Sequence, residues 1–269
     1  MKTYGTSNIR NIALIGAKGV GKTSFVEAAL FSSGATGRMG RVVEGNSVID
    51  YDPIEVERHQ TIISKITPIE WKQFKINLLD TPGYSDFIGE AVGAMSVCDV
   101  SLFVVDASSG VEIPAIRLYN YMKETGRGRA FLINKADGEH ADVAAAVASI
   151  RENLESSAPE FQIAIGGKAQ FKGVVDLLGM KAYINEGGSL KEADIPADMV
   201  EEAKSKRTVL IEAVAENDES LLEKYLESGE LSTRKSYAVV QRVSLPETST
   251  RYLSPAATTT SASMLFSTP

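Results

Sequence analysis

The sequence predicts an α/β fold, in which a mostly parallel β-sheet is covered by helices and a small α+β subdomain is inserted after it. Two observations support this prediction. Short apolar runs such as 100–105 alternate with helical patterns up to about residue 154, as in parallel sheets that are buried on both faces. After Ser156 this alternation of strand and helix patterns ends, and short strand patterns precede one long acidic stretch with helical character.

The first part of the chain supplies most of the expected elements. Alternating or continuous apolar residues indicate strands, and apolar residues at helical spacing indicate helices. In chain order we expect a strand at 11–15, a helix at 22–31, a long loop at 33–57, paired strands at 62–71 and 72–80, a helix at 86–97, a strand at 100–105, a helix at 113–124, a strand at 130–133 and an alanine-rich helix at 139–154. A loop as long as 33–57 is unusual inside a compact domain unless it has a function.

The remaining chain reads differently. Strands are expected at 171–178 and 181–184, and one or two acidic helices at 197–229. We therefore divide the chain into a core domain at 8–158, an inserted subdomain at 159–231 and a tail at 232–269. From Arg234 onward, 36 residues hold 13 Ser or Thr, a single acidic residue and no apolar pattern, so we expect this tail to be disordered or poorly packed.

Composition narrows the class of protein. With 269 residues and a net charge of −7, the chain does not resemble a protein that coats nucleic acid by electrostatics, and we expect no direct sequence-specific nucleic-acid binding. Cys98 is the only cysteine and lies in an apolar stretch, so it is expected to be a small buried residue in a reducing compartment. No apolar run is long enough to span a membrane and 1–10 lacks the core of a signal peptide, so we expect a cytoplasmic monomer.

The strongest motif is a glycine-rich loop that matches the pattern G-x-x-x-x-G-K-[ST], the P-loop. It lies between an expected strand and an expected helix, which is the context that phosphate binding requires. Backbone N–H groups of such a loop point at phosphate oxygens, Lys22 neutralises the β- and γ-phosphates, and the Thr23 hydroxyl binds Mg²⁺. The expected nucleotide-binding residues here are Gly16, Ala17, Lys18, Gly19, Val20, Gly21, Lys22, Thr23 and Ser24.

Three further motifs follow in the order that a guanine-nucleotide hydrolase needs. Thr61, in the long loop, is placed to give a hydroxyl to Mg²⁺ and an N–H to the γ-phosphate. Asp80 would hold Mg²⁺ through water, and the N–H of Gly83 would bind the γ-phosphate. Beyond a later strand, 134–137 has the pattern N-K-x-D and supplies base recognition.

The last motif selects guanine. The expected contacts come from Asn134, Lys135 and Asp137. The Asp137 carboxylate can accept from both N1–H and the exocyclic amine of guanine, a donor pair that adenine lacks. Each of the three later motifs alone is a weak signal, but their order after the P-loop and their places at strand ends support one joint prediction: GTP or GDP with Mg²⁺.

The chain resembles the GTPase domain of translational GTPases, specifically elongation factor G and elongation factor G-like proteins. The resemblance covers about 8–231 and rests on the P-loop and on the segments 52–62, 76–87, 104–107 and 134–137, with 171–178 matching the subdomain that elongation factor G inserts. It implies a P-loop GTPase fold, GTP hydrolysis assisted by Lys22, Thr61 and Gly83, and the ribosome as partner.

Two residue patterns depart from this family. Most elongation factors carry, after Asp-Thr-Pro-Gly, a histidine that positions the attacking water, and here that residue is Tyr84. A phenol with a pKa near 10 can hydrogen-bond to water but is a poor substitute for an imidazole. The usual Arg-Gly-Ile-Thr is also replaced, by 58–61 with the sequence Arg-His-Gln-Thr. Both changes resemble the elongation factor G-like branch, so we expect slow intrinsic hydrolysis, with His59 and His140 as solvated loop residues.

The tail is the other departure. The resemblance implies a last strand, a Gly-Ser-Ala-like loop over the guanine and further domains, none of which is recognisable here. Read one base earlier, codons for 255–269 could encode Gly-Ser-x-x-x-Phe-Gly-Val-Asp-Ala-Leu-Leu-Asp-Ala, which is similar to the missing segment. We therefore expect that a frameshift beyond Leu231 replaced the native ending, with an ordinary disordered tail as the alternative.

Other functions remain open at this point. A truncated domain could hold nucleotide weakly and lack translocation activity, or the chain could be a stand-alone regulatory GTPase that acts on a protein partner. Measured GDP affinity separates the first alternative from an active GTPase, and ribosome-stimulated hydrolysis separates the second.

Overall fold

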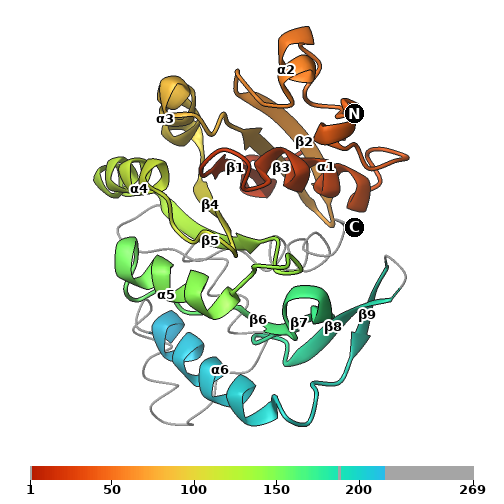
Figure 1. Ribbon diagram of the computed structural model, residues 1–269, viewed down its shortest axis with the longest axis vertical. Coiled ribbons are helices and arrows are strands. Elements are labelled where there is room, and N and C mark those ends of the chain that lie inside the picture. Colours follow the sequence, from red (N-terminus) through yellow and green to blue (C-terminus); the bar gives the residue numbers. More distant parts are fainter. Residues whose placement is uncertain (1, 187–188, 216–269) are drawn as a thin grey trace.

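A five-stranded sheet forms the centre of the larger part of the molecule (Figure 1). The computed structural model describes residues 2–186 and 189–215. From one edge to the other, the strands are β2 (Lys65–Trp71), β3 (Phe74–Asp80), β1 (Ile9–Ile15), β4 (Val100–Asp106) and β5 (Gly128–Asn134). Strands β3, β1, β4 and β5 run parallel, and β2 is antiparallel to β3. The mostly parallel sheet and the paired strands expected from the sequence are thus confirmed.

Helices cover both faces of this sheet. Successive side chains of a strand point to opposite faces, so Leu14 packs in a core with α1 (Lys22–Ser32) while Ile15 packs in a second core. That second core includes α3 (Ile88–Val97) and α4 (Ile113–Thr125), which lie together on one side of the sheet in Figure 1. Cys98 is fully buried there, as expected.

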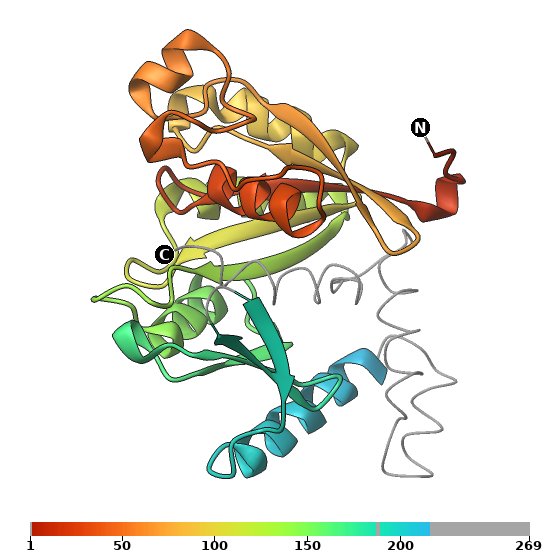
Figure 2. The ribbon, with the colours of Figure 1, turned by 90° about the vertical axis from the view of Figure 1, so that its right-hand side faces the viewer.

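A second, smaller sheet follows α5 (Val143–Asn153). It is a four-stranded antiparallel meander of β6 (Gln162–Ile165), β7 (Gly173–Asp176), β8 (Lys181–Glu186) and β9 (Ser189–Ala193). Helix α6 (Val200–Ala215) packs on it through a separate apolar core that includes Val175, Leu177 and Leu210. Figure 2 shows this sheet and α6 below the larger sheet, so the expected small α+β unit is present.

The loop expected at 33–57 contains more structure than its sequence suggested. A 3₁₀ turn, η2 (Val42–Glu44), and a short helix, α2 (Pro53–Arg58), lie within or at the end of it. The Asp52 side chain caps α2 by accepting a hydrogen bond from the Ile54 N–H at 2.8 Å, and Pro53 occupies the first turn. A helix of six residues is too short for apolar periodicity to reveal it.

Several element boundaries also differ from the expectation. Strand β2 begins at Lys65 rather than residue 62, because Glu55 accepts hydrogen bonds from the N–H groups of Ile62 and Ile63. Helix α5 begins at residue 143 rather than 139, because the Asp142 side chain caps its first turn by accepting a hydrogen bond from the Ala145 N–H. The strand expected at 171–178 is confined to β7, and β6 and β9 were not expected. Three further 3₁₀ turns are η1 (Thr6–Asn8), η3 (Ser85–Phe87) and η4 (Lys168–Gln170).

The part of the acidic stretch beyond residue 215 and the tail at 232–269, including the expected frameshift, lie outside the described residues. The domain boundaries drawn from the sequence therefore stay predictions. Within the described ranges, no helix combines the length and apolarity needed to cross a membrane.

Candidate nucleotide-binding site

The larger sheet brings the predicted motifs to one edge. In the pairing of β1 with β3, Leu14 lies opposite Asp80, and in the pairing of β4 with β5, Asp106 lies opposite Asn134. Parallel strands end at the same edge of a sheet, which is where open α/β sheets bind ligands. The loops that follow β1, β3 and β5 are therefore neighbours.

Two glycines of the P-loop are required by close backbone approach. Gly16 has a φ of +154°, and a Cβ added there would lie 2.4 Å from the carbonyl oxygen of Val104. Gly21 has a φ of +96°, and its Cβ would lie 2.3 Å from Nδ2 of Asn134. A side chain at either position would collide with another strand or loop, so the pattern needs glycine here for packing as well as for phosphate access.

Lys22 begins α1 and its ammonium group turns back into the loop. Its Nζ donates to the carbonyl oxygens of Gly16 at 2.9 Å and Ala17 at 2.8 Å. The residue is only 6% exposed, and this burial lowers the pKa of Lys22 to about 8, against the opposing influence of Asp80. A phosphate placed beside this ammonium would compensate its buried charge. Ser24 follows Thr23 in the first turn of the helix and is half-buried.

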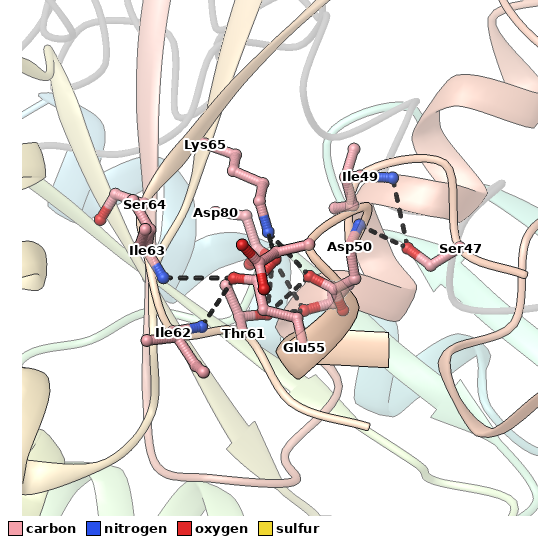
Figure 3. Close-up of polar contacts among 12 residues, drawn as sticks. Ser47, Ile49, Asp50, Glu55, Thr61, Ile62, Ile63, Ser64, Lys65 and Asp80 are labelled. Carbon is pink, nitrogen blue, oxygen red and sulfur yellow. Dashed lines mark hydrogen bonds and ion pairs between the residues drawn. The ribbon is translucent and has the colours of Figure 1, made fainter. Parts of the chain in front are cut away.

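Hydroxyl and carboxylate groups converge beside Lys22. Oγ1 of Thr23 donates to Oδ2 of Asp80 at 2.7 Å and lies 2.9 Å from Oγ1 of Thr61. The Thr61 hydroxyl is also 3.4 Å from Oδ2 of Asp80 and 3.2 Å from Oδ1 of Asp50 (Figure 3). The three residues that the sequence assigned to Mg²⁺ thus meet, although they are separated by 38 and 19 positions along the chain.

This donor set fits a hard cation. Oδ1 of Asp80 and Oδ2 of Asp50 are buried and have no hydrogen-bond partner among the described residues. Burial raises the pKa of Asp80 to about 6 and also raises that of Asp50, because each charge lacks full compensation. Within the described ranges no three His, Cys, Asp or Glu side chains form a metal cluster, so Mg²⁺ would depend on these hydroxyls, water and phosphate oxygens.

Gly83 and Tyr84 lie against the P-loop. A Cβ on Gly83 would lie 2.6 Å from the carbonyl of Ala17 and from the backbone nitrogen of Lys18, so the two loops touch. The Lys18 ammonium sits over the Tyr84 ring, 4.6 Å from its centroid. The loops expected to surround the γ-phosphate are therefore joined by a cation–π contact between their side chains.

The base-recognition motif is tied to the same loop. Nδ2 of Asn134 donates to the carbonyl oxygen of Val20 at 2.9 Å, and Nζ of Lys135 donates to that of Gly19 at 2.6 Å. Lys135 also pairs with the Asp106 carboxylate at 2.8 Å. Asp137 lies exposed in the same loop, where its carboxylate is accessible to a base.

Sequence reasoning missed four buried charged residues around this site: Glu27, Asp50, Glu55 and Lys65. Glu27, on α1, accepts hydrogen bonds from the Ser47 hydroxyl at 2.7 Å and the Val48 N–H at 2.6 Å, which fastens the loop at 40–49 to the helix. Fixed spacing could not reveal these contacts, because each depends on the path of the long loop. The one available signal was the unusual length of that loop.

A cavity of about 1020 Å³ lies elsewhere, between α5 and the smaller sheet. Its lining includes Leu132, Val147, Phe161 and Val174, and no residue of the P-loop. The cavity touches the base-recognition motif only at Ala136.

Comparison with known proteins agrees with this geometry. The model of the family described as the elongation factor Tu GTP binding domain matches residues 7–258. The fold is also similar to a crystal structure of a protein from Thermus thermophilus, with a TM-score of 0.81 and 32% sequence identity over 88% of this chain. The match spans only 36% of the Thermus chain.

Proposed function

We propose that this protein binds GTP and GDP with Mg²⁺ and hydrolyses GTP to GDP and phosphate. The premise is its family: the chain belongs to the family of the elongation factor Tu GTP binding domain and is a translational GTPase domain. The finer part of the proposal is that it belongs to an elongation factor G-like protein that acts on the ribosome. The match to the family and the similarity to the Thermus structure support the first part, and the inserted sheet supports the second.

One observation carries the proposal: the hydrogen bond from Asn134 to the Val20 carbonyl. It fastens the base-recognition loop to the P-loop. A nucleotide whose phosphates lie along residues 16–23 would then have its base beside Asp137. The same contact explains why Gly21 must be glycine, since a Cβ there would displace Asn134.

The residues of the chain divide the work of binding. Lys22 and the N–H groups of the P-loop would hold the β- and γ-phosphates. Thr23, Thr61 and Asp80 would hold Mg²⁺, which supplies neutralisation of the phosphate charge when it is bound. Asn134, Lys135 and Asp137 would hold the guanine, with the Asp137 carboxylate accepting from two ring donors.

Hydrolysis needs little more than positioning and charge stabilisation. Water attacks the γ-phosphorus, the bond to the oxygen that bridges the β- and γ-phosphates breaks, and the protons of the water leave with the inorganic phosphate. Gly83 lies against Ala17 and Lys18 of the P-loop, and the Tyr84 ring lies against the Lys18 ammonium. In this proposal the Gly83 backbone and the Tyr84 hydroxyl face the attacking water. Because a phenol cannot take up a proton and carry positive charge near neutral pH as an imidazole can, we propose that turnover is slow without a partner.

Titration with GDP, ADP and XDP tests the guanine assignment. The wild-type protein should bind GDP and reject ADP. In Asp137→Asn, the side-chain NH₂ group replaces one of the two carboxylate oxygens, so a donor faces the exocyclic amine of guanine and GDP affinity should fall about 10–100-fold. Xanthine has a carbonyl in place of that amine, so XDP should bind better to the variant. Glu139→Gln, which changes an exposed carboxylate two positions away, is the matched control and should leave GDP binding unchanged. Equal binding of ADP and GDP by the wild type would contradict the assignment.

Phosphate release, measured with and without ribosomes, tests whether the domain belongs to a translation factor that acts on the ribosome. Stimulation of hydrolysis by ribosomes supports a translation factor. Hydrolysis without stimulation favours a stand-alone regulatory GTPase, and GDP binding without hydrolysis favours a nucleotide-binding module.

A further inference from the structure

Lys18 is a P-loop residue whose side chain the motif does not explain. It occupies one of the x positions of G-x-x-x-x-G-K-[ST], so the pattern requires only its backbone. The side chain is exposed, and its ammonium lies over the Tyr84 ring, 4.6 Å from the ring centroid. The phosphate-binding loop therefore carries a second lysine, besides Lys22, that the proposed function does not use.

The lysines around this loop differ in how their charge is compensated. Lys22 donates to two carbonyl oxygens of the loop, and Lys135 pairs with the Asp106 carboxylate at 2.8 Å. Within the ranges that the structure describes, Lys18 forms no ion pair, and its ammonium faces the ring of Tyr84. A cation–π contact at an exposed site is weak, whereas an ammonium binds a phosphate strongly. An anion bound beside Lys18 would therefore draw its ammonium away from the ring.

The backbone of Lys18 lies beside the position proposed for the γ-phosphate. A Cβ on Gly83 would lie 2.6 Å from the Lys18 backbone nitrogen, and the Gly83 N–H is the group proposed to bind that phosphate. Next to Lys18, a Cβ on Gly19 would have no atom within 4 Å, so the loop is open at this point. The flexible four-carbon stem of a lysine allows its ammonium to turn toward an anion there.

We propose that Lys18 is a catalytic residue whose ammonium, held beside the site by the Tyr84 ring, binds the γ-phosphate and stabilises its negative charge during hydrolysis. The inference rests on the proposed function, since it takes the γ-phosphate to lie at Gly83. When water attacks the γ-phosphorus and the bond to the bridging oxygen breaks, Lys18 keeps its proton and acts only by its charge. Some GTPases receive such a charge from an arginine of their own chain or of a partner, and here a lysine of the P-loop would supply it.

Single-turnover hydrolysis by the isolated protein, together with nucleotide affinities, tests the proposal. Lys18→Met removes the charge and keeps most of the stem, so hydrolysis should slow by about tenfold or more. GDP has no γ-phosphate, so its affinity should stay within about twofold of the wild-type value. A non-hydrolysable GTP analogue should bind about three- to tenfold more weakly, because it loses a charged partner of its γ-phosphate.

Two further variants separate the charge from packing. Lys18→Arg keeps a cation and should hydrolyse GTP within about fivefold of the wild-type rate. Lys123→Met is the matched control, because it removes another exposed lysine whose ammonium lies over a tyrosine ring, 5.5 Å from the ring centroid of Tyr119. That contact is on α4, which supplies no residue to the site. Lys123→Met should therefore match the wild type in all three measurements.

Tyr84→Leu tests the role of the ring. Without the ring, the ammonium is no longer held beside the site, so Lys18→Met should slow hydrolysis less in the Tyr84→Leu background than in the wild type. Equal losses in the two backgrounds would overturn the assignment of Tyr84 as the group that holds Lys18.

The proposal is overturned if Lys18→Met hydrolyses GTP as fast as the wild type, or if Lys18→Arg is as slow as Lys18→Met. It is also overturned if Lys18→Met weakens GDP as much as the analogue, because Lys18 would then be a structural part of the loop. Failure of the wild type to bind any guanine nucleotide would instead refute the proposed function. If the wild type binds GTP without hydrolysing it, the proposed hydrolysis fails together with the catalytic role, and the ratio of analogue to GDP affinity still decides whether Lys18 contacts the γ-phosphate.

Discussion

Lys22 turns its ammonium group into the P-loop, where the carbonyl oxygens of Gly16 and Ala17 accept its hydrogen bonds. Carbonyls compensate a buried positive charge less well than a phosphate does, and burial accordingly lowers the pKa of this lysine. The group proposed to bind phosphate thus destabilises the protein when no phosphate is bound. Such a conflict between stability and binding is expected at functional sites.

The variant Lys22→Met separates these two roles. It keeps most of the apolar stem but removes the buried charge, so the nucleotide-free protein should melt at the same or a higher temperature than the wild type. GDP with Mg²⁺ should raise the melting temperature of the wild type and leave that of the variant unchanged. Thermal denaturation with and without GDP measures both effects. A variant that melts much earlier without nucleotide would contradict this account of Lys22.

The ring and the hydroxyl of Tyr84 have separate proposed roles, which one variant can distinguish. Tyr84→Phe keeps the ring face that contacts the Lys18 ammonium but removes the hydroxyl that is proposed to orient a water. GTP-analogue affinity should therefore be unchanged, while single-turnover hydrolysis should slow by about tenfold or more. Unchanged turnover would exclude the hydroxyl from the mechanism. Tyr121→Phe, which removes a hydroxyl on α4, is the control for loss of a phenol elsewhere.

At the scale of elements, an ion network joins two helices to β5. The Glu155 carboxylate, just after α5, accepts hydrogen bonds from the Tyr119 hydroxyl of α4 at 2.7 Å and from Nε of Arg129 of β5 at 2.8 Å. Burial acts to raise the pKa of Glu155, but the hydrogen bonds from Tyr119 and Arg129 outweigh it and the pKa is lowered. The charged carboxylate therefore stabilises the fold.

Glu155→Gln should lower the free energy of unfolding at neutral pH by about 1–3 kcal/mol, because Arg129 loses its charged acceptor in a partly buried site. A lowered pKa means that the wild type gains this stability above the ordinary pKa of glutamate and loses it as the pH falls through the lowered value. The difference between wild type and variant should thus shrink as the solution is acidified through that range. Urea unfolding at several pH values measures it, and a difference independent of pH would argue against the ion pair.

The sequence predicted the elements that repeat a simple pattern and missed those that depend on contacts. The strands β1 and β4 are visible as short continuous apolar runs, and α1 is visible because it follows the P-loop motif with apolar residues at helical spacing. Helix α2 is fixed instead by the Asp52 cap, and the start of β2 by hydrogen bonds from Ile62 and Ile63 to Glu55. Neither contact leaves a periodic trace.

In the site, too, the residues within fixed motifs were predicted and those that depend on the path of the long loop were missed. Lys22 follows β1, and Asp80 and Asn134 are the last residues of β3 and β5. Each has a fixed place in its motif, so the sequence predicted that they would meet, and in the structure their loops are neighbours. Asp50, Glu55 and Lys65 meet only because the long loop folds back on itself. Their pairing depends on a path that no local pattern specifies.

At the scale of the whole molecule, the chain builds separate apolar cores. The predicted site lies on the larger sheet, whose cores contain residues such as Leu78 of β3, while the smaller sheet and α6 share a core that contains Leu210. Leu78 is 3% exposed and Leu210 is fully buried. Because the two cores share no side chain, damage to one should be felt only weakly at the other.

Leu210→Ala and Leu78→Ala test this independence as a matched pair. Each removes the same atoms from a buried position and should lower the free energy of unfolding of its own part by about 2–5 kcal/mol. Leu210→Ala should leave GDP affinity at the wild-type value, since α6 supplies no residue to the site. Leu78→Ala should weaken it, because Leu78 lies two positions before Asp80, the carboxylate proposed to hold Mg²⁺, on the same strand. Hydrogen exchange of the two sheets together with GDP titration measures both effects, and equal losses of affinity in the two variants would show that the smaller sheet supports the site.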